Sequence, residues 1–196
     1  MKKIVPLDCS LVPDTAQLVF KGEIFSVYHW PQELFDGTSA TFEMLRRPDT
    51  VKAICLTEDG IIALEDEQPT RSKKLVFPGG RVDTSDPSTL EAVQREVHEE
   101  TGYTFRNWRL ISVQQRFVKI EWFVYVYVAW DGEKVSEPHL DAGEKISVRT
   151  LPFGEVRKLA LDRVGYLTDA LEIFEKVQSV DELMALPEFE GREVER

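Results

Sequence analysis

Residues 79–103 read GGRVDTSDPSTLEAVQREVHEETGY, and this stretch decides what the rest of the chain is expected to form. A Gly-Gly pair follows a short apolar run, an acidic loop comes next, and a helical pattern ends at Gly102. Glu96, Glu99 and Glu100 are three or four residues apart, so they lie near one face of that helix. Like charges gathered in this way indicate a bound cation, and oxygen ligands favour Mg²⁺ or Mn²⁺ over zinc.

The order of these residues resembles the Nudix box, in which Gly, five residues, an acid and seven residues precede Arg-Glu-apolar-X-Glu-Glu-X-Gly-apolar. The second half matches fully from Arg95 to Tyr103, and five residues separate Gly80 from Asp86. Asp86 stands where the family usually has Glu, and eight residues rather than seven lie between it and Arg95. The insertion precedes the acidic helix face, so it bears on the role of Asp86 and leaves the helix intact.

A plain solvated face is the alternative for this helix, because acidic residues on helices most often only face water. Two features favour a site. The glycines allow the backbone to approach a ligand closely, and Arg95 adjoins the acids, where it can orient one of them.

Composition limits the partners of this protein. The chain of 196 residues has a net charge of -11, from 24 basic and 35 acidic residues, which disfavours nucleic acid or an anionic membrane as a partner. A small anionic substrate is still accepted where metals and a few Arg residues reverse the local charge. Cys9 and Cys55 give no disulfide framework or zinc motif. We find no leader and no run of about 20 apolar residues, and expect a cytoplasmic protein.

The hydrophobic pattern predicts an α/β (α+β) protein in three layers. Residues 17–47 alternate around turns and are expected to form a small antiparallel sheet, whereas 122–130 is apolar on both faces and belongs inside a larger sheet. Residues 66–74 read as a loop, 163–177 as a helix, and both chain ends as irregular. The resemblance implies the Nudix fold, a mixed sheet between helices. We divide the chain into an N-terminal sheet, 1–47, expected to dimerise, and a Nudix hydrolase domain, 48–196.

The resemblance also implies site roles. Nudix enzymes hydrolyse a nucleoside diphosphate linked to another group, using divalent metal. Glu96, Glu99 and Glu100 would hold Mg²⁺ or Mn²⁺, helped by a backbone carbonyl of Gly79 or Gly80, and Arg95 would orient a carboxylate. Asp83 and Asp86 are weaker metal candidates, with turn or helix-cap roles as the alternative.

A general base is expected downstream of the box, in the acidic loop 138–144. Glu144 fits best by position, with Asp141 and His139 as alternatives. A box glutamate, such as Glu99 or Glu100, is another choice, and an ordinary hairpin loop is the plain reading.

Residues upstream of the box point to a substrate class. Glu67-Gln68, Arg71 and the run leading to Gly79-Gly80 resemble the EQxR…lPaG pattern of ADP-ribose pyrophosphatase-like Nudix proteins. That resemblance implies a homodimer built by the N-terminal sheet. It makes Arg71 and Arg46 or Arg47 phosphate ligands, against surface salt bridges, and makes Trp30 or Tyr28 a base-stacking residue, against a core or interface aromatic.

The function expected is divalent-metal-dependent hydrolysis of ADP-ribose or a nucleotide sugar, giving a nucleoside monophosphate and a sugar phosphate. The alternatives are a nucleoside triphosphate pyrophosphohydrolase and a Nudix-fold module that senses a nucleotide without cutting it.

Overall fold

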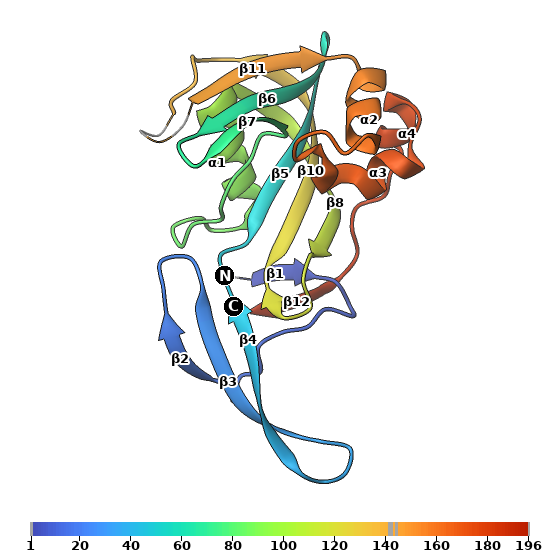
Figure 1. Cartoon of the computed structure of the whole chain (residues 1–196). Helices are drawn as coiled ribbons and strands as arrows, with labels where there is room; N and C mark the ends of the chain where they lie inside the picture. The colour runs from blue at the N-terminus through green and yellow to red at the C-terminus, as the bar shows by residue number, and fades with distance from the viewer. Residues whose placement is uncertain (1, 141–142, 144, 196) are drawn as a thin grey trace.

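The computed structural model describes residues 2–140, 143 and 145–195, without the side chain of Arg71, and its centre is a mixed sheet (Figure 1). The strands are β5 (Thr50–Thr57), β6 (Gly60–Gln68), β7 (Arg71–Val76), β8 (Tyr103–Gln115), β10 (Phe123–Lys134) and β11 (Lys145–Leu151). Their order is β11-β6-β5-β10-β8, with β7 also paired to β6. Strands β5 and β10 run parallel and the other pairs antiparallel, which confirms the mixed sheet.

Helices cover both faces of this sheet (Figure 1). Helix α1 (Thr89–Thr101) packs Val93 and Val97 on one face; α2 (Phe153–Leu161), the 3-10 helix η1 (Leu167–Ala170), α3 (Leu171–Lys176) and α4 (Val180–Met184) cover the other. Along β10, alternate residues enter the two cores, and residues 123–129 are all buried. The apolar run therefore lies inside the sheet as predicted, because both of its faces are covered.

The ends of α1 follow directly from its sequence. The Ser88 side chain accepts hydrogen bonds from the backbone N–H groups of Leu90 and Glu91, so Ser88 rather than Asp86 caps the helix. Gly102 ends it at φ 72°, in the left-handed region that favours glycine, and its N–H donates to the carbonyl of His98. These ends fix which residues face the loop after β7.

A second sheet extends from this body and contains β2 (Gln17–Lys21), β3 (Ser26–Glu33), β4 (Ser39–Arg46) and β9 (Ile120–Glu121) (Figure 1). Strands β2, β3 and β4 pair antiparallel, which confirms the small N-terminal sheet. Fully buried Glu121 accepts hydrogen bonds from Arg46 and from the Val12 N–H. This charge pair joins β4 to β9 within the sheet, and β9 leads directly into β10 of the body.

Residues 2–5 and 192–195 form strands, where irregular chain ends were expected. Strand β1 (Lys2–Val5) pairs antiparallel with β12 (Arg192–Glu195). The Lys3 ammonium lies 2.6 Å from Asp49, and both side chains are buried.

The prediction of a loop at 66–74 was also wrong, because those residues continue β6 and turn back as β7.

Candidate active site

The largest cavity that we describe has a volume of about 620 Å³ and lies where α1, the loop after β7, the starts of β5 and β10, and η1 meet. Its walls carry most of the charged residues that the sequence singled out. Those residues are Arg47, Asp83, Arg95, Glu96, Glu99, Glu100 and His139, and the cavity is also lined by Lys52, Trp122 and Asp169.

The Gly79-Gly80 loop brings backbone against the acidic helix face. Gly79 has φ 129°, and a Cβ there would lie 2.2 Å from the carbonyl oxygen of Val51 on β5. A Cβ on Gly80 would lie 2.5–2.7 Å from the atoms of the Glu96 carboxylate. Both positions therefore require glycine, one for its backbone angle and one to leave room for Glu96.

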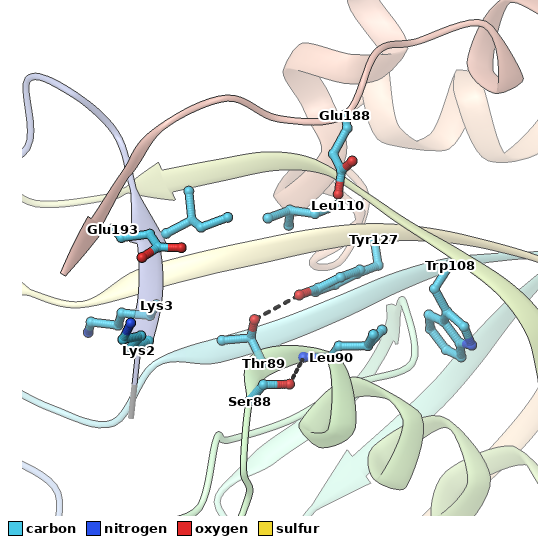
Figure 2. Close-up of a pocket in the computed structure, with 11 residues that line it drawn as sticks. Lys2, Lys3, Ser88, Thr89, Leu90, Trp108, Leu110, Tyr127, Glu188 and Glu193 are labelled. Carbon is cyan, nitrogen blue, oxygen red and sulfur yellow. Dashed lines mark hydrogen bonds between the residues drawn. The ribbon is translucent and has the colours of Figure 1, made fainter. Parts of the chain in front are cut away.

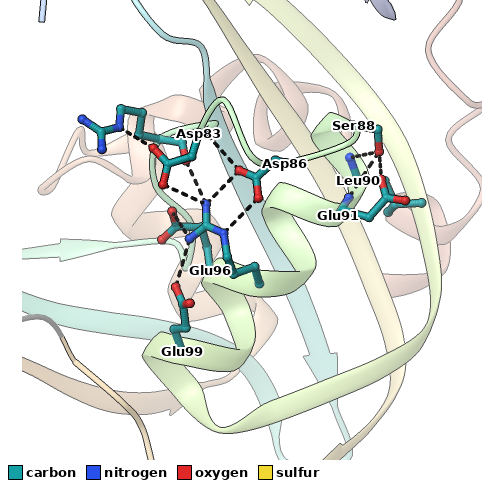
Figure 3. A network of polar contacts seen from close by, with 9 residues as sticks. Asp83, Asp86, Ser88, Leu90, Glu91, Glu96 and Glu99 are labelled. Carbon is teal, nitrogen blue, oxygen red and sulfur yellow. Dashed lines mark hydrogen bonds and ion pairs between the residues drawn. The ribbon is translucent and has the colours of Figure 1, made fainter. Parts of the chain in front are cut away.

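Arg95 is the centre of the polar network on this face, and its partners Asp86, Glu96 and Glu99 are labelled in Figure 3. Its Nε and Nη2 atoms each donate to Asp86 at 3.0 Å, and Nη1 donates to Glu96 and Glu99, also at 3.0 Å. Nη2 also contacts the carbonyl of Arg81 at 3.2 Å. These hydrogen bonds raise the pKa of Arg95, and those to Asp86 hold the pKa of Asp86 below its usual value. Arg95 is thus held beside Asp86, Glu96 and Glu99.

Asp86 closes the acidic loop in spite of the extra residue. It accepts a hydrogen bond from the Asp83 N–H at 2.8 Å, and its own N–H donates to the Asp83 carbonyl at 3.1 Å. Asp83 in turn accepts from Arg81. The inserted residue is absorbed in the loop, and Asp86 acts as the partner of Arg95.

The three glutamates of the acidic helix face differ in environment. Glu100 is buried and accepts the Gly79 N–H at 2.6 Å, which ties the end of α1 to the glycine loop. Burial raises the pKa of Glu96, and the charge of Arg95 opposes that rise. Glu99 is more open to the cavity, with its side chain 44% exposed.

The donors on this face suit a hard divalent cation. Arg95 uses one oxygen of Glu96 and one of Glu99, which leaves the second oxygen of each for another partner. Gly80 leaves room at the Glu96 carboxylate that any side chain would fill. In the part of the chain that the structure describes, however, no three His, Cys, Asp or Glu side chains form a ready metal cluster. The donor type fits Mg²⁺ or Mn²⁺, and binding requires the glutamates to converge.

Lys52, a residue that the sequence reading did not single out, lies beside these acids. Its Nζ donates to the carbonyl oxygens of Gly79, at 2.5 Å, and Phe77, at 3.2 Å. The Gly80 carbonyl accepts the Val51 N–H at 2.9 Å. Both glycine carbonyls proposed as metal ligands therefore already accept one hydrogen bond.

An aromatic and cationic wall lies at another side of the cavity. The Arg47 guanidinium lies 4.5 Å from the ring centroid of Trp122 and 5.6 Å from that of Phe25. The Trp122 indole N–H donates to the Thr50 hydroxyl at 3.0 Å. Sequence reasoning found Arg47 but missed Trp122, because Trp122 begins an apolar run that reads as sheet interior.

Trp30, predicted to stack on the base, lies away from the cavity. It lies on β3, with its ring 6.0 Å from that of Phe42 and its indole N–H bonded to Gln32. It does not line the cavity formed by the described residues of one chain. Arg46, the alternative to Arg47, is bonded to Glu121 instead.

The remaining predicted site residues fall mostly outside the described part of the chain. Glu144 and Asp141 are not described, and of Arg71 only the backbone is, as part of β7. His139 lines the cavity, and its backbone N–H donates to the Glu99 carbonyl at 2.7 Å. Asp169 on η1 also lines the cavity and pairs with Arg116 at 2.6 Å, a contact for which the sequence carried no signal.

A smaller cavity of about 310 Å³ lies beside the start of α1 (Figure 2). There the hydroxyls of Thr89 and Tyr127 are 2.7 Å apart, and Trp108 forms part of the wall. None of the residues predicted to bind metal or substrate lines it. We therefore place the candidate active site in the larger cavity.

Comparison with known proteins identifies the family of this chain. The NUDIX domain model matches residues 46–170. The chain is 24% identical over 154 residues to an ADP-ribose pyrophosphatase of Bacillus subtilis (strain 168), covering 76% of this chain and 82% of that protein. It is 27% identical over 141 residues to a methanol dehydrogenase activator of Bacillus methanolicus, covering 70% and 76%.

A solved structure supports the fold. A crystal structure of an ADP compounds hydrolase superposes with a TM-score of 0.58 at 21% identity, covering 80% of this chain and 84% of that one. The family model spans well over half of the chain, so this protein belongs to the Nudix family. It is a Nudix hydrolase, resembling the ADP-ribose pyrophosphatases as its sequence indicated.

Proposed function

We propose that the protein is a divalent-metal-dependent pyrophosphohydrolase that cleaves ADP-ribose or a nucleotide sugar to a nucleoside monophosphate and a sugar phosphate. One observation carries the proposal. A single cavity brings the box glutamates and the glycine loop together with an Arg47–Trp122 wall. The similarity to an ADP-ribose pyrophosphatase supports the same substrate class.

The two sides of the cavity suit the two parts of such a substrate. A diphosphate belongs at the acidic face, where Glu96, Glu99 and Glu100 would hold Mg²⁺ or Mn²⁺. When bound, the metal neutralises phosphate oxygens and lowers the pKa of a water. A nucleobase has a flat face that stacks on Trp122 or on the planar guanidinium of Arg47.

The roles of the chain's own residues follow from their contacts. Arg95 holds Glu96 and Glu99 in place through charge-assisted hydrogen bonds. Glu100 fixes the glycine loop through the Gly79 N–H. Glu144 remains the proposed general base, with Glu99 as the alternative because its carboxylate is the more open one. Arg71 remains a proposed phosphate ligand.

We also propose a homodimer formed through the N-terminal sheet. That sheet and its turns expose large apolar side chains on this chain, at Leu18, Val19, Phe20, Ile24 and Phe35. Exposed apolar patches of this kind mark interaction surfaces. Sedimentation at micromolar concentration tests the proposal, and a species with the mass of one chain would contradict it.

A cytoplasmic location and the absence of nucleic-acid or membrane partners are part of the same proposal, and the excess of 35 acidic over 24 basic residues supports them. No helix in the described ranges has the length and apolarity needed to cross a bilayer. Fractionation of cells that produce a tagged protein tests the location.

One chromatographic assay tests the activity. Purified protein with Mg²⁺ is incubated with ADP-ribose, GDP-mannose, UDP-glucose and a set of nucleoside triphosphates. Cleavage of ADP-ribose or of one sugar nucleotide to a monophosphate and a sugar phosphate supports the proposal. Release of pyrophosphate from triphosphates alone would make the protein a triphosphate pyrophosphohydrolase, and binding without turnover would make it a sensor.

A further inference from the structure

We propose that Lys52 is a phosphate-binding residue of this site, whose ammonium contacts an oxygen of the substrate's diphosphate between the Trp122 wall and the acidic face of α1. This inference rests on the proposed function, because it requires a diphosphate in the cavity. It adds a residue outside the Nudix box and outside every motif in the sequence.

The other cations that line the cavity already have partners in the chain. Arg95 is fully engaged by acidic side chains and a backbone carbonyl. Arg81 is exposed and pairs with Asp83 at 2.8 Å. Arg47 stacks on Trp122 at the outer wall. Among the described residues Lys52 forms no ion pair within 4.0 Å, and the contacts of its Nζ are with the backbone carbonyls of Phe77 and Gly79.

Lys52 lies on the face of β5 that packs into the apolar core. Side chains alternate along a strand, so Lys52 shares a sheet face with Thr50 and Ile54. Ile54 and Val126, the residue paired with Lys52 on β10, are fully buried in the core of that face. An aliphatic side chain would fit this row, and a partly buried ammonium carries a desolvation penalty there. Within the chain, this charge is offset by the carbonyls of Phe77 and Gly79 and by the carboxylates of Glu96 and Asp169 on the two sides of the cavity.

The ammonium group of Lys52 has more N–H donors than its two carbonyl contacts use. Two carbonyl oxygens, from Phe77 and Gly79, hold Nζ in place. An ammonium has three N–H donors, so one remains for a ligand in the cavity. Thr50, one residue along the same strand face, is bonded to Trp122, which places Lys52 next to the base-stacking wall.

The charges around Lys52 show why a diphosphate needs it. Glu96 and Asp169 both line the same cavity, and their charges would repel phosphate. Burial raises the pKa of both carboxyls, and the positive charge of Lys52 opposes that rise. Lys52 is therefore close enough to both walls to act on a ligand that lies between them.

A purely structural role is the competing explanation, in which Lys52 only fastens the glycine loop through its two carbonyl contacts. The two roles separate in two variants. Lys52→Gln keeps N–H donors for the loop but removes the charge, and Lys52→Arg keeps the charge. Lys158→Gln is the matched control, because Lys158 is an exposed lysine on α2 that does not line the cavity.

The experiment measures binding by calorimetry, without metal and in the presence of a chelator. The probes are α,β-methylene-ADP, whose P–C–P bridge resists hydrolysis, and adenosine, which has no phosphate. Melting temperatures of all variants are recorded in parallel. For Lys52→Gln we expect affinity for α,β-methylene-ADP to fall about tenfold, as for loss of a charge-assisted hydrogen bond. We expect adenosine binding to stay within about twofold, and Lys52→Arg to retain most of the diphosphate affinity.

The outcomes distinguish this inference from the proposed function. Equal losses of affinity for both probes in Lys52→Gln, or no loss for either, would overturn the role of Lys52. Binding of α,β-methylene-ADP by the wild-type protein would still support the proposed function in that case. Failure of the wild-type protein to bind α,β-methylene-ADP without metal would overturn the role of Lys52, whereas the proposed function is overturned only if the protein with Mg²⁺ cleaves neither ADP-ribose nor a nucleotide sugar.

Discussion

Arg95 and Asp86 are joined by two parallel hydrogen bonds of 3.0 Å, so the acidic loop is anchored to the middle of α1. Such a fork is the strongest geometry that an arginine offers to a carboxylate. The same guanidinium holds Glu96 and Glu99, which makes Asp86 a support for the acidic face.

Replacement of Asp86 by Asn tests that support. One charge-assisted contact is lost, so we expect the free energy of unfolding to fall by about 1–2 kcal/mol. We expect kcat to fall about tenfold because Arg95 no longer holds Glu96 and Glu99 as firmly. Urea unfolding and steady-state kinetics measure the two effects, with Asp59→Asn, in an exposed turn, as the control. Unchanged kcat in Asp86→Asn would argue against the supporting role.

The contact between Gly80 and Glu96 gives a second prediction. In Gly80→Ala the new methyl group would overlap the Glu96 carboxylate, so Glu96 must move. We expect a loss of activity of at least about tenfold, since a displaced acid disrupts positioning at the site, with a folded protein by circular dichroism. Gly154→Ala is the matched control, because nothing lies within 4 Å of a Cβ there. Full activity in Gly80→Ala would show that the placement of Glu96 is not needed.

The buried pair of Lys3 and Asp49 gives a prediction about stability. Asp49 also accepts the Phe123 N–H at 2.8 Å, so it joins β1 to the start of β10. In Lys3→Met the Asp49 carboxylate remains buried without its cation. We expect the free energy of unfolding to fall by about 3–5 kcal/mol. Urea unfolding measures it, and Lys2→Met, on the exposed side of β1, should change it little.

The wall of Arg47 and Trp122 gives a prediction about substrate affinity. In Trp122→Leu the flat stacking surface is lost, and we expect KM for ADP-ribose to rise about tenfold with a smaller change in kcat. Trp130→Leu is a close control, because Arg109 lies 5.3 Å over that ring, away from the cavity. An equal rise in KM in both variants would indicate a general loss of stability instead of a lost contact.

Much of the fold was predictable because its signals are local. The helix at 89–101 has its cap, its stripe of Val93 and Val97 and its terminal glycine in one continuous stretch. The buried part of β10, residues 123–129, shows as a run of apolar residues. The pairing of β1 with β12 was not predictable, because it joins residues at opposite ends of the chain.

The helix expected at 163–177 was only partly correct. Gly165 has φ 62° and packs against the Leu75 backbone, so the chain bends there and forms η1 and the short α3 instead. A pattern of apolar residues does not reveal such a contact, because the partner strand lies far away in the sequence.

The candidate site also has a part that the sequence predicts and a part that it does not. The acids and Arg95 belong to one motif, and the structure brings them together. Lys52, Trp122 and Asp169 come from three separate elements and meet only in the folded chain. Nothing in their local sequence marks them, since each has an ordinary place on a strand or in a short helix.

The central claim is tested most directly by the products formed from ADP-ribose with Mg²⁺. The account predicts AMP and ribose 5-phosphate in equal amounts from the wild-type protein, no products when the metal is chelated, and a rate at least about a hundredfold lower in Glu99→Gln and Glu100→Gln. Equal rates in the wild-type protein and both variants, or cleavage that persists without divalent metal, would contradict it.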